Sequence, residues 1–399
     1  MLKSIYQCEE GNYIHCYTCT SKYIFIVESA LSSPYDIFLK FSKIDEVAAN
    51  VKTLNYPILF NRKTLAVDDS TPRVQSIKIV NVPKFVEGKL IIDNYLVLTS
   101  TNGIQICSVD DIIDYQNSNS NTKIHKWDHS RRNDYITSSY SQGYKEDSIL
   151  VTYGTILGDL VQFKYNIVDG KFSKMILSST LLSVKENLMD SVTNISGIQL
   201  GSNFPGEEDE ILWSCQSSSK MMTITSLDDN IFIINEGKMK SLNLDEIETY
   251  GLGPDEVPAL NWGSFLVTED ENKKLQEYIL LNVTNVGSIL YQKDETKRWK
   301  KLDVFDRDFS QNETSIFDCI ICKSDINSDI TIISGSENGI LYIWEYDPKR
   351  STVNKYKQIK CSNSSVVYQL SVTKEGRLFL VDNDSTCVKS LKLSQISSS

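Results

Sequence analysis

The sequence predicts an all-β protein assembled from repeated four-stranded antiparallel units. Three observations support this fold class. Residues that favour pleated sheet are abundant, including 20 Tyr and 14 Phe among 399 residues. One hairpin pattern recurs along the whole chain. The chain also has only eight prolines and 18 glycines, which argues against a disordered or fibrous protein.

The clearest copy of the hairpin is TIISGSENGILYIWEYD, residues 331–347. It reads as an apolar strand, a tight turn ending at Gly339, and a second apolar strand that contains Trp344. Tight hairpin turns need positive φ, which Gly and Asn adopt most readily, and five of the seven turns carry Gly or Asn-Gly. The six weaker copies are residues 12–28, 95–109, 148–165, 210–227, 278–293 and 366–382.

Both strands of each hairpin are apolar almost continuously, as expected for strands covered on both faces. The flanking segments alternate polar and apolar residues, which is typical of outer strands: residues 36–43, 73–82, 171–179, 298–306 and 353–360. Two inner and two outer strands make a four-stranded unit. The count predicts seven units, with six or eight as the neighbouring solutions, and the uneven spacing indicates loop insertions on a constant scaffold.

Residues 332–345 resemble the central hairpin of a WD40 repeat. The resemblance implies a β-propeller, often seven-bladed, here a divergent one occupying residues 1–396 as a single domain with 397–399 as a frayed tail. The family's Trp-Asp end reads Trp344-Glu345, and Asn338 replaces its turn aspartate. With only three histidines, the family's His-centred hydrogen-bond network cannot exist in most blades. Ring closure would pair residues 2–8 with 387–393.

The formal net charge is −11, so the surface as a whole repels nucleic acid. No secretory leader and no apolar run long enough to span a bilayer are visible in the sequence. Together with the odd count of nine cysteines, these features predict an intracellular protein with reduced thiols and no membrane insertion, either nuclear or cytoplasmic with the nucleus favoured.

The segment 114–135 reads as a long polar loop between the second and third blades. Its basic and aromatic residues His125, Trp127, Arg131 and Arg132 form one candidate partner-binding surface, and Tyr250 is another. The alternative is a solvated loop in which Trp127 packs against a blade.

Metal and cofactor sites are not expected. The pairs Cys16/Cys19 and Cys319/Cys322 have Cys-x-x-Cys spacing, but each falls inside an expected strand. There positions i and i+3 face opposite sides, so one ion could not bind both thiolates, and buried cysteines acting as small hydrophobes fit better. Motifs for a phosphate loop, a nucleophile elbow and a zinc protease are missing, so we do not expect an enzyme.

The function expected is a non-catalytic scaffold whose partners are other subunits of a complex, of the nucleoporin, coat or chromatin type that the resemblance implies. No small-molecule substrate is expected. Two alternatives stay open. One is a hydrolase in the central channel, with a carboxylate as its base. The other is an anionic-ligand or nucleic-acid module using the basic residues within 125–132.

Overall fold

The structure is a computed structural model, and it describes most of the strands along the chain. The described residues are 3–44, 52–54, 74–86, 89–118, 124–129, 134–143, 147–157, 159–175, 192–200, 210–217, 221–228, 231–236, 260–269, 274–283, 287–293, 299–305, 316–323, 329–336, 338–361, 367–373, 376–382 and 387–394. The chain divides into two compact units, which are described separately: Met1–Gln7, Gly197–Ser214 and Lys220–Ser399 form unit 1, and Cys8–Ser196 with Cys215–Ser219 form unit 2.

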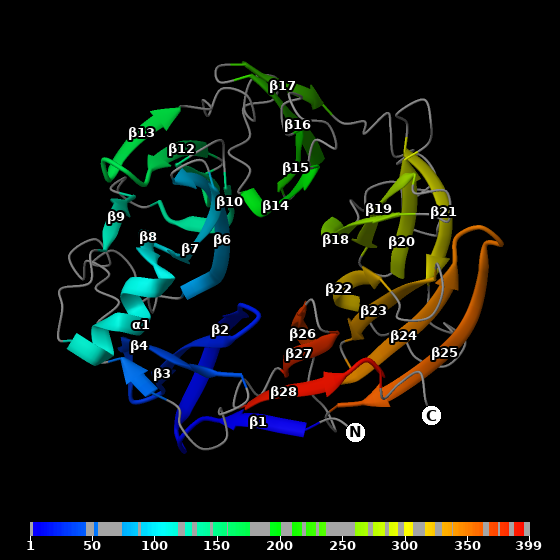
Figure 1. The fold of residues 1–399 in the computed structure, drawn as a ribbon, viewed down its shortest axis with the longest axis horizontal. Coiled ribbons are helices and arrows are strands. Elements are labelled where there is room, and N and C mark those ends of the chain that lie inside the picture. The colour runs from blue at the N-terminus through cyan, green and yellow to red at the C-terminus, as the bar shows by residue number, and fades with distance from the viewer. Residues whose placement is uncertain are drawn as a thin grey trace. The chain divides into compact units, whose positions relative to one another are not determined.

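Unit 2 contains three complete four-stranded sheets, ordered β2-β3-β4-β5, β6-β7-β8-β9 and β10-β11-β12-β13 (Figure 1). The strands of the first two are β2 (Asn12–Cys19), β3 (Tyr23–Ala30), β4 (Ser33–Lys43), β5 (Lys52–Leu54), β6 (Val74–Val86), β7 (Lys89–Ser100), β8 (Gly103–Ser108) and β9 (His125–Asp128). Those of the third are β10 (Ile136–Gly143), β11 (Ser148–Thr155), β12 (Leu160–Asn166) and β13 (Lys171–Met175).

Unit 1 also contains three complete sheets, ordered β18-β19-β20-β21, β22-β23-β24-β25 and β26-β27-β28-β1. Their strands are β18 (Leu260–Glu269), β19 (Leu275–Val283), β20 (Gly287–Lys293), β21 (Trp299–Phe305), β22 (Ile316–Lys323), β23 (Ile330–Ser336), β24 (Ile340–Asp347), β25 (Thr352–Lys360), β26 (Val367–Val372), β27 (Arg377–Asp382), β28 (Cys387–Lys392) and β1 (Lys3–Gln7). The seventh sheet is β14 (Val192–Leu200), β15 (Glu210–Ser217), β16 (Met221–Asp228) and β17 (Ile231–Glu236).

The expected all-β class with four-stranded antiparallel sheets is therefore confirmed. Five of the seven sequence hairpins are the two middle strands of their sheet, but the first and last are not. Residues 12–28 form strands one and two of the first sheet, and 366–382 form strands one and two of the last. Two segments expected on outer strands lie elsewhere: residues 74–82 are on β6, the first strand of its sheet, and residues 36–43 are on β4, the third strand of its sheet. Local apolar patterning cannot distinguish a first from a middle strand when neighbouring sheets cover both.

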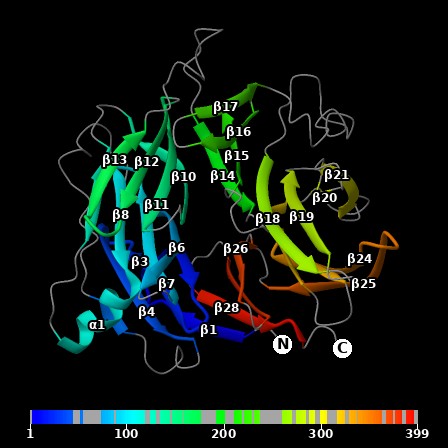
Figure 2. The same ribbon diagram turned by 45° about the horizontal axis from the view of Figure 1, so that its top comes forward.

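The N-terminal strand completes the last sheet. β1 pairs with β28 in antiparallel register, from Lys3 opposite Ser390 to Gln7 opposite Cys387. Figure 2 shows the two strands side by side in unit 1. This is the pairing of the chain ends that the sequence predicts, and it covers the edge of β28 that would otherwise stay open.

In each of the six sheets that lie wholly within one unit, the first strand carries an irregularity near its N-terminal end. The register shifts at Ile14/Cys16 in β2, Val74/Ser76 in β6 and Ile136/Ser138 in β10. It shifts again in β18, β22 and β26. A bulge bends its strand and increases the local twist. In unit 2 the first strand β6 packs beside the first strands β2 and β10, and in unit 1 β22 packs beside β18 and β26.

The core of each unit lies between successive sheets. In unit 2, the cluster around Phe25, Leu39, Leu96 and Leu98 joins the first two sheets. In unit 1, the cluster around Tyr278, Ile332 and Trp344 joins the sheets of β19 and β23. Side chains on both faces of β3, β11 and β24 are buried, whereas the outer strand β25 alternates between exposed and half-buried positions. This is the distinction between inner and outer strands that the sequence predicts.

The segment 114–135, expected as a loop, is partly regular. The helix α1 (Val109–Ser118) includes its first residues, and β9 is the fourth strand of the second sheet. The helix buries Val109 and Ile112 in the same cluster as Phe25, and these two residues precede the segment that looks polar in the sequence. Polar composition concealed β9 because a short outer strand shows only one face to the core.

Candidate functional site

Two residues predicted to bind a partner, His125 and Trp127, lie on β9. Their side chains are half-buried, whereas those of Lys126 and Asp128 between and after them are exposed. The other predicted residues, Arg131, Arg132 and Tyr250, lie outside the described part of the chain. β9 thus turns its basic and acidic residues outward and its aromatic residues toward the next sheet.

Trp127 packs against β12 and β13, the third and fourth strands of the third sheet. Its ring is stacked on Phe163 with centroids 4.7 Å apart, and it meets Phe172 at 5.7 Å. The ring of His125 lies 4.9 Å from that of Tyr165. A Cβ added at Gly170 would come within 2.6 Å of His125. This arrangement agrees with the alternative in which Trp127 packs against a blade, and it leaves only part of each ring to a partner.

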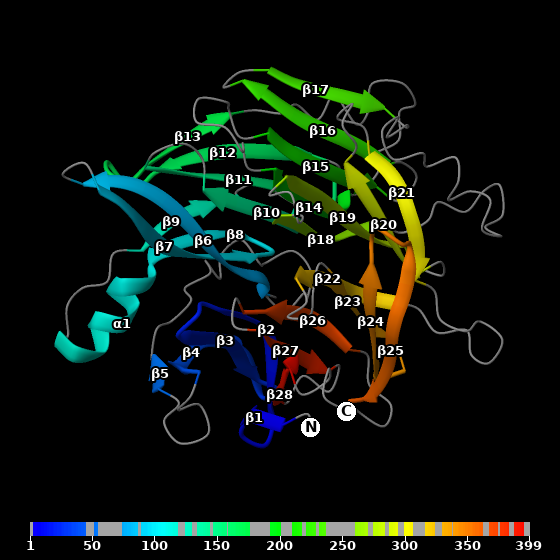
Figure 3. The same ribbon diagram turned by 45° about the vertical axis from the view of Figure 1, so that its right-hand side comes forward.

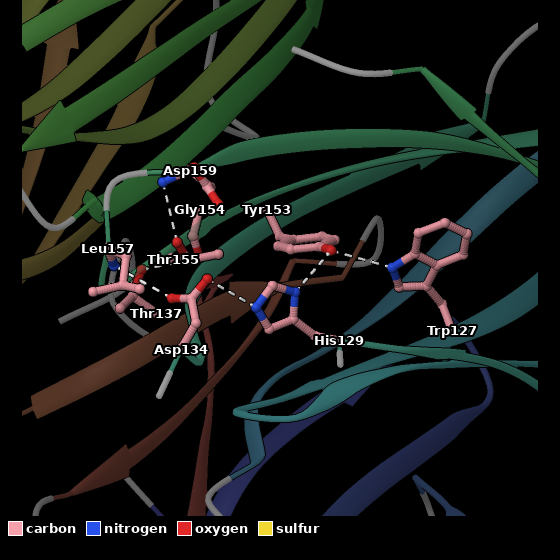
Figure 4. Close-up of polar contacts among 9 residues, drawn as sticks. All are labelled: Trp127, His129, Asp134, Thr137, Tyr153, Gly154, Thr155, Leu157 and Asp159. Carbon is pink, nitrogen blue, oxygen red and sulfur yellow. Dashed lines mark hydrogen bonds and ion pairs between the residues drawn. The ribbon is translucent and has the colours of Figure 1, made fainter. Parts of the chain in front are cut away.

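A chain of hydrogen bonds continues from Trp127 through the junction of the second and third sheets (Figure 4). The Nε1–H of Trp127 donates to the hydroxyl of Tyr153 at 3.2 Å. The same hydroxyl lies 3.2 Å from Nδ1 of His129. The Nε2 atom of His129 lies 3.0 Å from a carboxylate oxygen of Asp134.

The donors and acceptors in this series of hydrogen bonds fit a neutral His129. An ionised Asp134 can only accept, so Nε2 of His129 is the donor toward it. In the neutral ring Nδ1 is then an acceptor, and Tyr153 donates its hydroxyl proton there while accepting from Trp127. Every group of the chain has a partner, which is the condition for a buried polar network to stabilise a fold.

Asp134, at the far end of this series of hydrogen bonds, fixes the turn that follows β11. Asp134 also accepts from the backbone N–H of Leu157 at 3.3 Å. Burial alone would raise the pKa of the Asp134 carboxyl, but the hydrogen bonds from His129, Thr155 and the backbone of Leu157 outweigh it and lower the pKa. Thr155 in turn accepts from the backbone N–H of Asp159 at 3.1 Å.

A tyrosine, a histidine and an aspartate in series invite comparison with a catalytic triad, but the chemistry does not fit. A nucleophilic hydroxyl must be within reach of a substrate as well as of a base. Tyr153 is only 2% exposed, so a substrate does not reach it. Burial raises the pKa of Tyr153 to about 12, although Trp127 donates to its oxygen. Its hydroxyl also already has two partners. The arrangement works as a clamp between two sheets.

Sequence reasoning missed Asp134 and Tyr153. It expected the His-centred network of the WD40 family to be absent from most blades, and among the described residues a His-centred network is present at the junction of the second and third sheets. The sequence held one signal for this site, because Asp134 follows His129 by five positions. His129 comes just after β9 and Asp134 just before β10, but both strands were hidden by the interpretation of this segment as a loop. Tyr153 lies 24 positions from His129, and only the folded structure brings it close.

Other buried titratable groups are also occupied in structural contacts. Lys40 lies 2.5 Å from Glu28, with both side chains buried, and the amide of Asn12 donates to the same carboxylate oxygen at 2.9 Å. The ammonium of Lys78 lies 3.9 Å from the centroid of the Tyr140 ring, and burial lowers its pKa to about 8. Such contacts stabilise charge inside a fold without requiring a ligand.

Asp318 has a similar role in unit 1. Its carboxylate accepts from the backbone N–H groups of Leu370, at 2.6 Å, and Cys319, at 2.9 Å. Burial raises its pKa to about 6, although both hydrogen bonds act in the opposite direction. The carboxylate joins the irregular stretch of β22 to that of β26, so it ties the first strands of two neighbouring sheets together.

The two Cys-x-x-Cys pairs lie inside β2 and β22, as the sequence predicts. Cys319 belongs to the apolar cluster on one side of its sheet, and Cys322 packs against the cluster on the other side. The two thiols of this pair thus face opposite ways, which one shared ion cannot accommodate. Burial raises the pKa of both Cys16 and Cys319, which disfavours the thiolate that a metal would need.

Comparison with known proteins identifies the fold. No protein-family model matches the sequence, and no curated protein matches it either. Solved structures do match: YCF48 from Cyanidioschyzon merolae has a TM-score of 0.52 and 8% identity, covering 98% of this chain and 99% of that one. Sqt1 from Saccharomyces cerevisiae has a TM-score of 0.50 and 12% identity, covering 95% and 85%. Raptor from Chaetomium thermophilum has a TM-score of 0.52 and 8% identity, covering 97% of this chain but 28% of that one.

These structures are WD40 and β-propeller proteins. The fold is that of a divergent β-propeller. The four-stranded sheets are its blades, and residues 332–345 carry the family-like hairpin on β23 and β24. At these identities the likeness concerns the fold alone. Within the described residues, no helix is both long and apolar enough to cross a membrane.

Proposed function

We propose that this chain is a non-catalytic interaction scaffold: a seven-bladed propeller, closed by β1 on β28, that serves as a subunit of a larger complex in the nucleus or cytoplasm. The buried carboxylates of the described blades support this proposal. Glu28, Asp134 and Asp318 each make contacts that hold strands together. A rigid scaffold that presents surface elements to other proteins is the role that such an architecture serves best.

The observation that carries the proposal is a two-stranded ribbon at the end of β6 and β7. The pairing of β7 with β8 begins at Tyr95, opposite Ser108. β6 and β7 nevertheless stay paired as far as Val86 opposite Lys89 (Figure 3). The ribbon, residues 81–86 and 89–94, therefore extends past the third strand of its own blade.

The ribbon exposes apolar side chains on both faces. Ile91 is 43% exposed and Ile92 is 56% exposed. Because successive side chains of a strand point to opposite faces, neither face of the ribbon near its tip is fully covered. A two-stranded ribbon has little stability of its own in water, and an adjacent pair of exposed isoleucines marks an interaction surface.

Capture from the native source tests this role. A tagged chain is purified with its associated proteins, which are identified and quantified by mass spectrometry. We expect partners in stoichiometric amount, and we expect Ile91→Thr with Ile92→Thr to lose at least one of them. Threonine keeps the preference for strand while removing apolar surface.

The matched control is Leu31→Thr with Val168→Thr, which removes two exposed apolar side chains from turns at other places in unit 2. The control is expected to keep every partner. A chain that purifies alone would contradict the scaffold role. Equal loss of partners from both variants would contradict the assignment to the ribbon.

A further inference from the structure

The outer strand β25 differs from the other outer strands of the propeller. It is the last strand of its blade, with β24 as its neighbour in the described sheets. It runs for nine residues, whereas β1, β5, β9, β13, β17 and β21 have five, three, four, five, six and seven. Proteins ordinarily keep edge strands short because an open edge invites pairing with another chain.

The charge of this region is opposite to that of the chain. No Asp or Glu occurs between residues 348 and 374, although the chain carries a net charge of −11. The basic residues of this stretch that the structure describes are Lys349, Arg350, Lys355, Lys357 and Lys360. Lys389 of β28 adds a further cation beside the end of β25, where its Nζ donates to the backbone oxygen of Cys361 at 2.8 Å.

β25 also exposes apolar surface between these charges. Tyr356 is 46% exposed and Val353 is 44% exposed. The ring of Tyr356 is held in place, since it stacks on Trp344 with centroids 5.6 Å apart. Its hydroxyl accepts a hydrogen bond from Gln358 at 2.6 Å. Lysines alone would only protect an edge, whereas lysines beside a fixed, half-exposed aromatic ring can also bind.

We propose that the outer edge of β25 binds an acidic, extended segment of a partner protein, which adds to the blade as a fifth strand. This inference rests on the proposed scaffold role and supplies the chemistry of one partner. The backbone of the added strand pairs with the outer edge. Its acidic side chains meet the lysines of β25, and an apolar side chain packs on Tyr356.

The pleat of β25 sets the pattern of the partner segment. Lys355 and Lys357 lie on one face of the strand, and Tyr356 between them lies on the other. A paired strand places its own side chains on the same faces as the residues opposite. The matching sequence is therefore an acidic residue, an apolar residue and an acidic residue in succession.

The test uses the full chain and a labelled, end-blocked peptide of alternating glutamate and valine, as long as β25. Binding is followed by fluorescence polarisation at low and at moderate salt. We expect Lys355→Glu with Lys357→Glu to weaken binding by at least about tenfold, because one attraction becomes a repulsion at each position. Tyr356→Ser is expected to weaken binding at both salt concentrations, since the contact it removes carries no charge.

The matched control is Lys22→Glu with Lys43→Glu, which makes the same change in net charge at two exposed lysines of unit 2. It should change the affinity by no more than about twofold, as expected for charges away from the interface. Peptide that does not bind, or binds both double variants alike, would overturn the proposal. Equal competition by single-stranded DNA would also overturn it, because the edge would then be a phosphate-binding surface.

The same variants separate this inference from the scaffold role. If the wild-type chain captures partners from its source and Lys355→Glu with Lys357→Glu captures the same set, β25 is not the docking edge and the scaffold role still stands. Thermal unfolding of each variant, expected within a few degrees of the wild type, shows that the blade itself is intact.

Discussion

Two blade junctions of this propeller are stabilised in different ways. The hairpin β23–β24, whose sequence looks most like a WD40 repeat, places Trp344 in an aromatic cluster with Phe305 and Tyr342. The junction between β9 and β11 has no such sequence, yet it holds the Trp127–Tyr153–His129–Asp134 chain. In this protein, one blade carries the sequence that resembles the family, and a different blade junction carries the His-centred polar network.

The difference shows what a divergent blade requires. A fully covered hairpin such as β24 can rely on apolar burial and aromatic contact. A four-residue outer strand such as β9 buries little, so hydrogen bonds that reach across to the next sheet contribute more of its attachment. Four changes test how the junctions are held, from the largest expected effect to the smallest.

Trp344→Ala should have the largest effect. The side chain is 5% exposed and is packed among aromatic rings. Its removal leaves a cavity, and we expect the free energy of unfolding to fall by about 3–5 kcal/mol. Urea unfolding followed by circular dichroism measures it. Tyr356→Ala, on the exposed side of the same cluster, should cost less than half as much, and equal losses would show that the packing is not centred on Trp344.

The buried carboxylate of Asp318 should make stability depend on pH. Its pKa, raised by burial to about 6 from an ordinary 3.8, means that the folded state binds the proton more tightly than the unfolded state. The resulting stabilisation is complete below about pH 4 and is lost as the pH rises to about 6, by up to roughly 3 kcal/mol. Asp318→Asn removes the titration, so wild-type stability should fall relative to this variant over that interval. A flat difference would contradict the assignment.

Asp134 should make stability depend on pH in the opposite direction. Its pKa is lowered, so it stabilises the fold above the ordinary pKa of an aspartate, and the stabilisation is lost as the pH falls below that value. The two carboxylates thus report separately on the β22–β26 junction and on the β9–β11 junction in one pH series. Asp134→Asn should reduce the loss at low pH and leave the interval governed by Asp318 unchanged.

The polar chain should show the smallest effect at neutral pH, together with strong coupling. His129→Ala removes one hydrogen-bond partner from Asp134 and one from Tyr153, and we expect the free energy of unfolding to fall by about 1–3 kcal/mol. Tyr153→Phe should cost less, and the double variant less than the sum, with a coupling of about 1 kcal/mol in a double-mutant cycle. Strictly additive losses would mean that His129 and Tyr153 are not energetically coupled.

The sequence by itself determined the strand content, the middle strands of five blades and the pairing of the two chain ends. Continuous apolar runs and Gly-bearing turns are local signals, and they predict β11, β12, β23 and β24 without knowledge of the rest of the chain. The alternating pattern of residues 353–360 likewise identified β25 as an outer strand, because the exposure of one face is recorded in the residues themselves.

Only the tertiary structure decided the strand positions in the first and last blades, the existence of β9 and the partners of His129. An apolar strand looks the same whether it is first or second in its blade, since both are covered by neighbouring sheets. β9 is too short for its period to be read, and the rings that Trp127 contacts, Phe163 and Phe172, lie far along the chain. The chain from Trp127 to Asp134 depends on β11 folding back beside β9, and such long-range pairing is set by the packed fold and not by the local sequence.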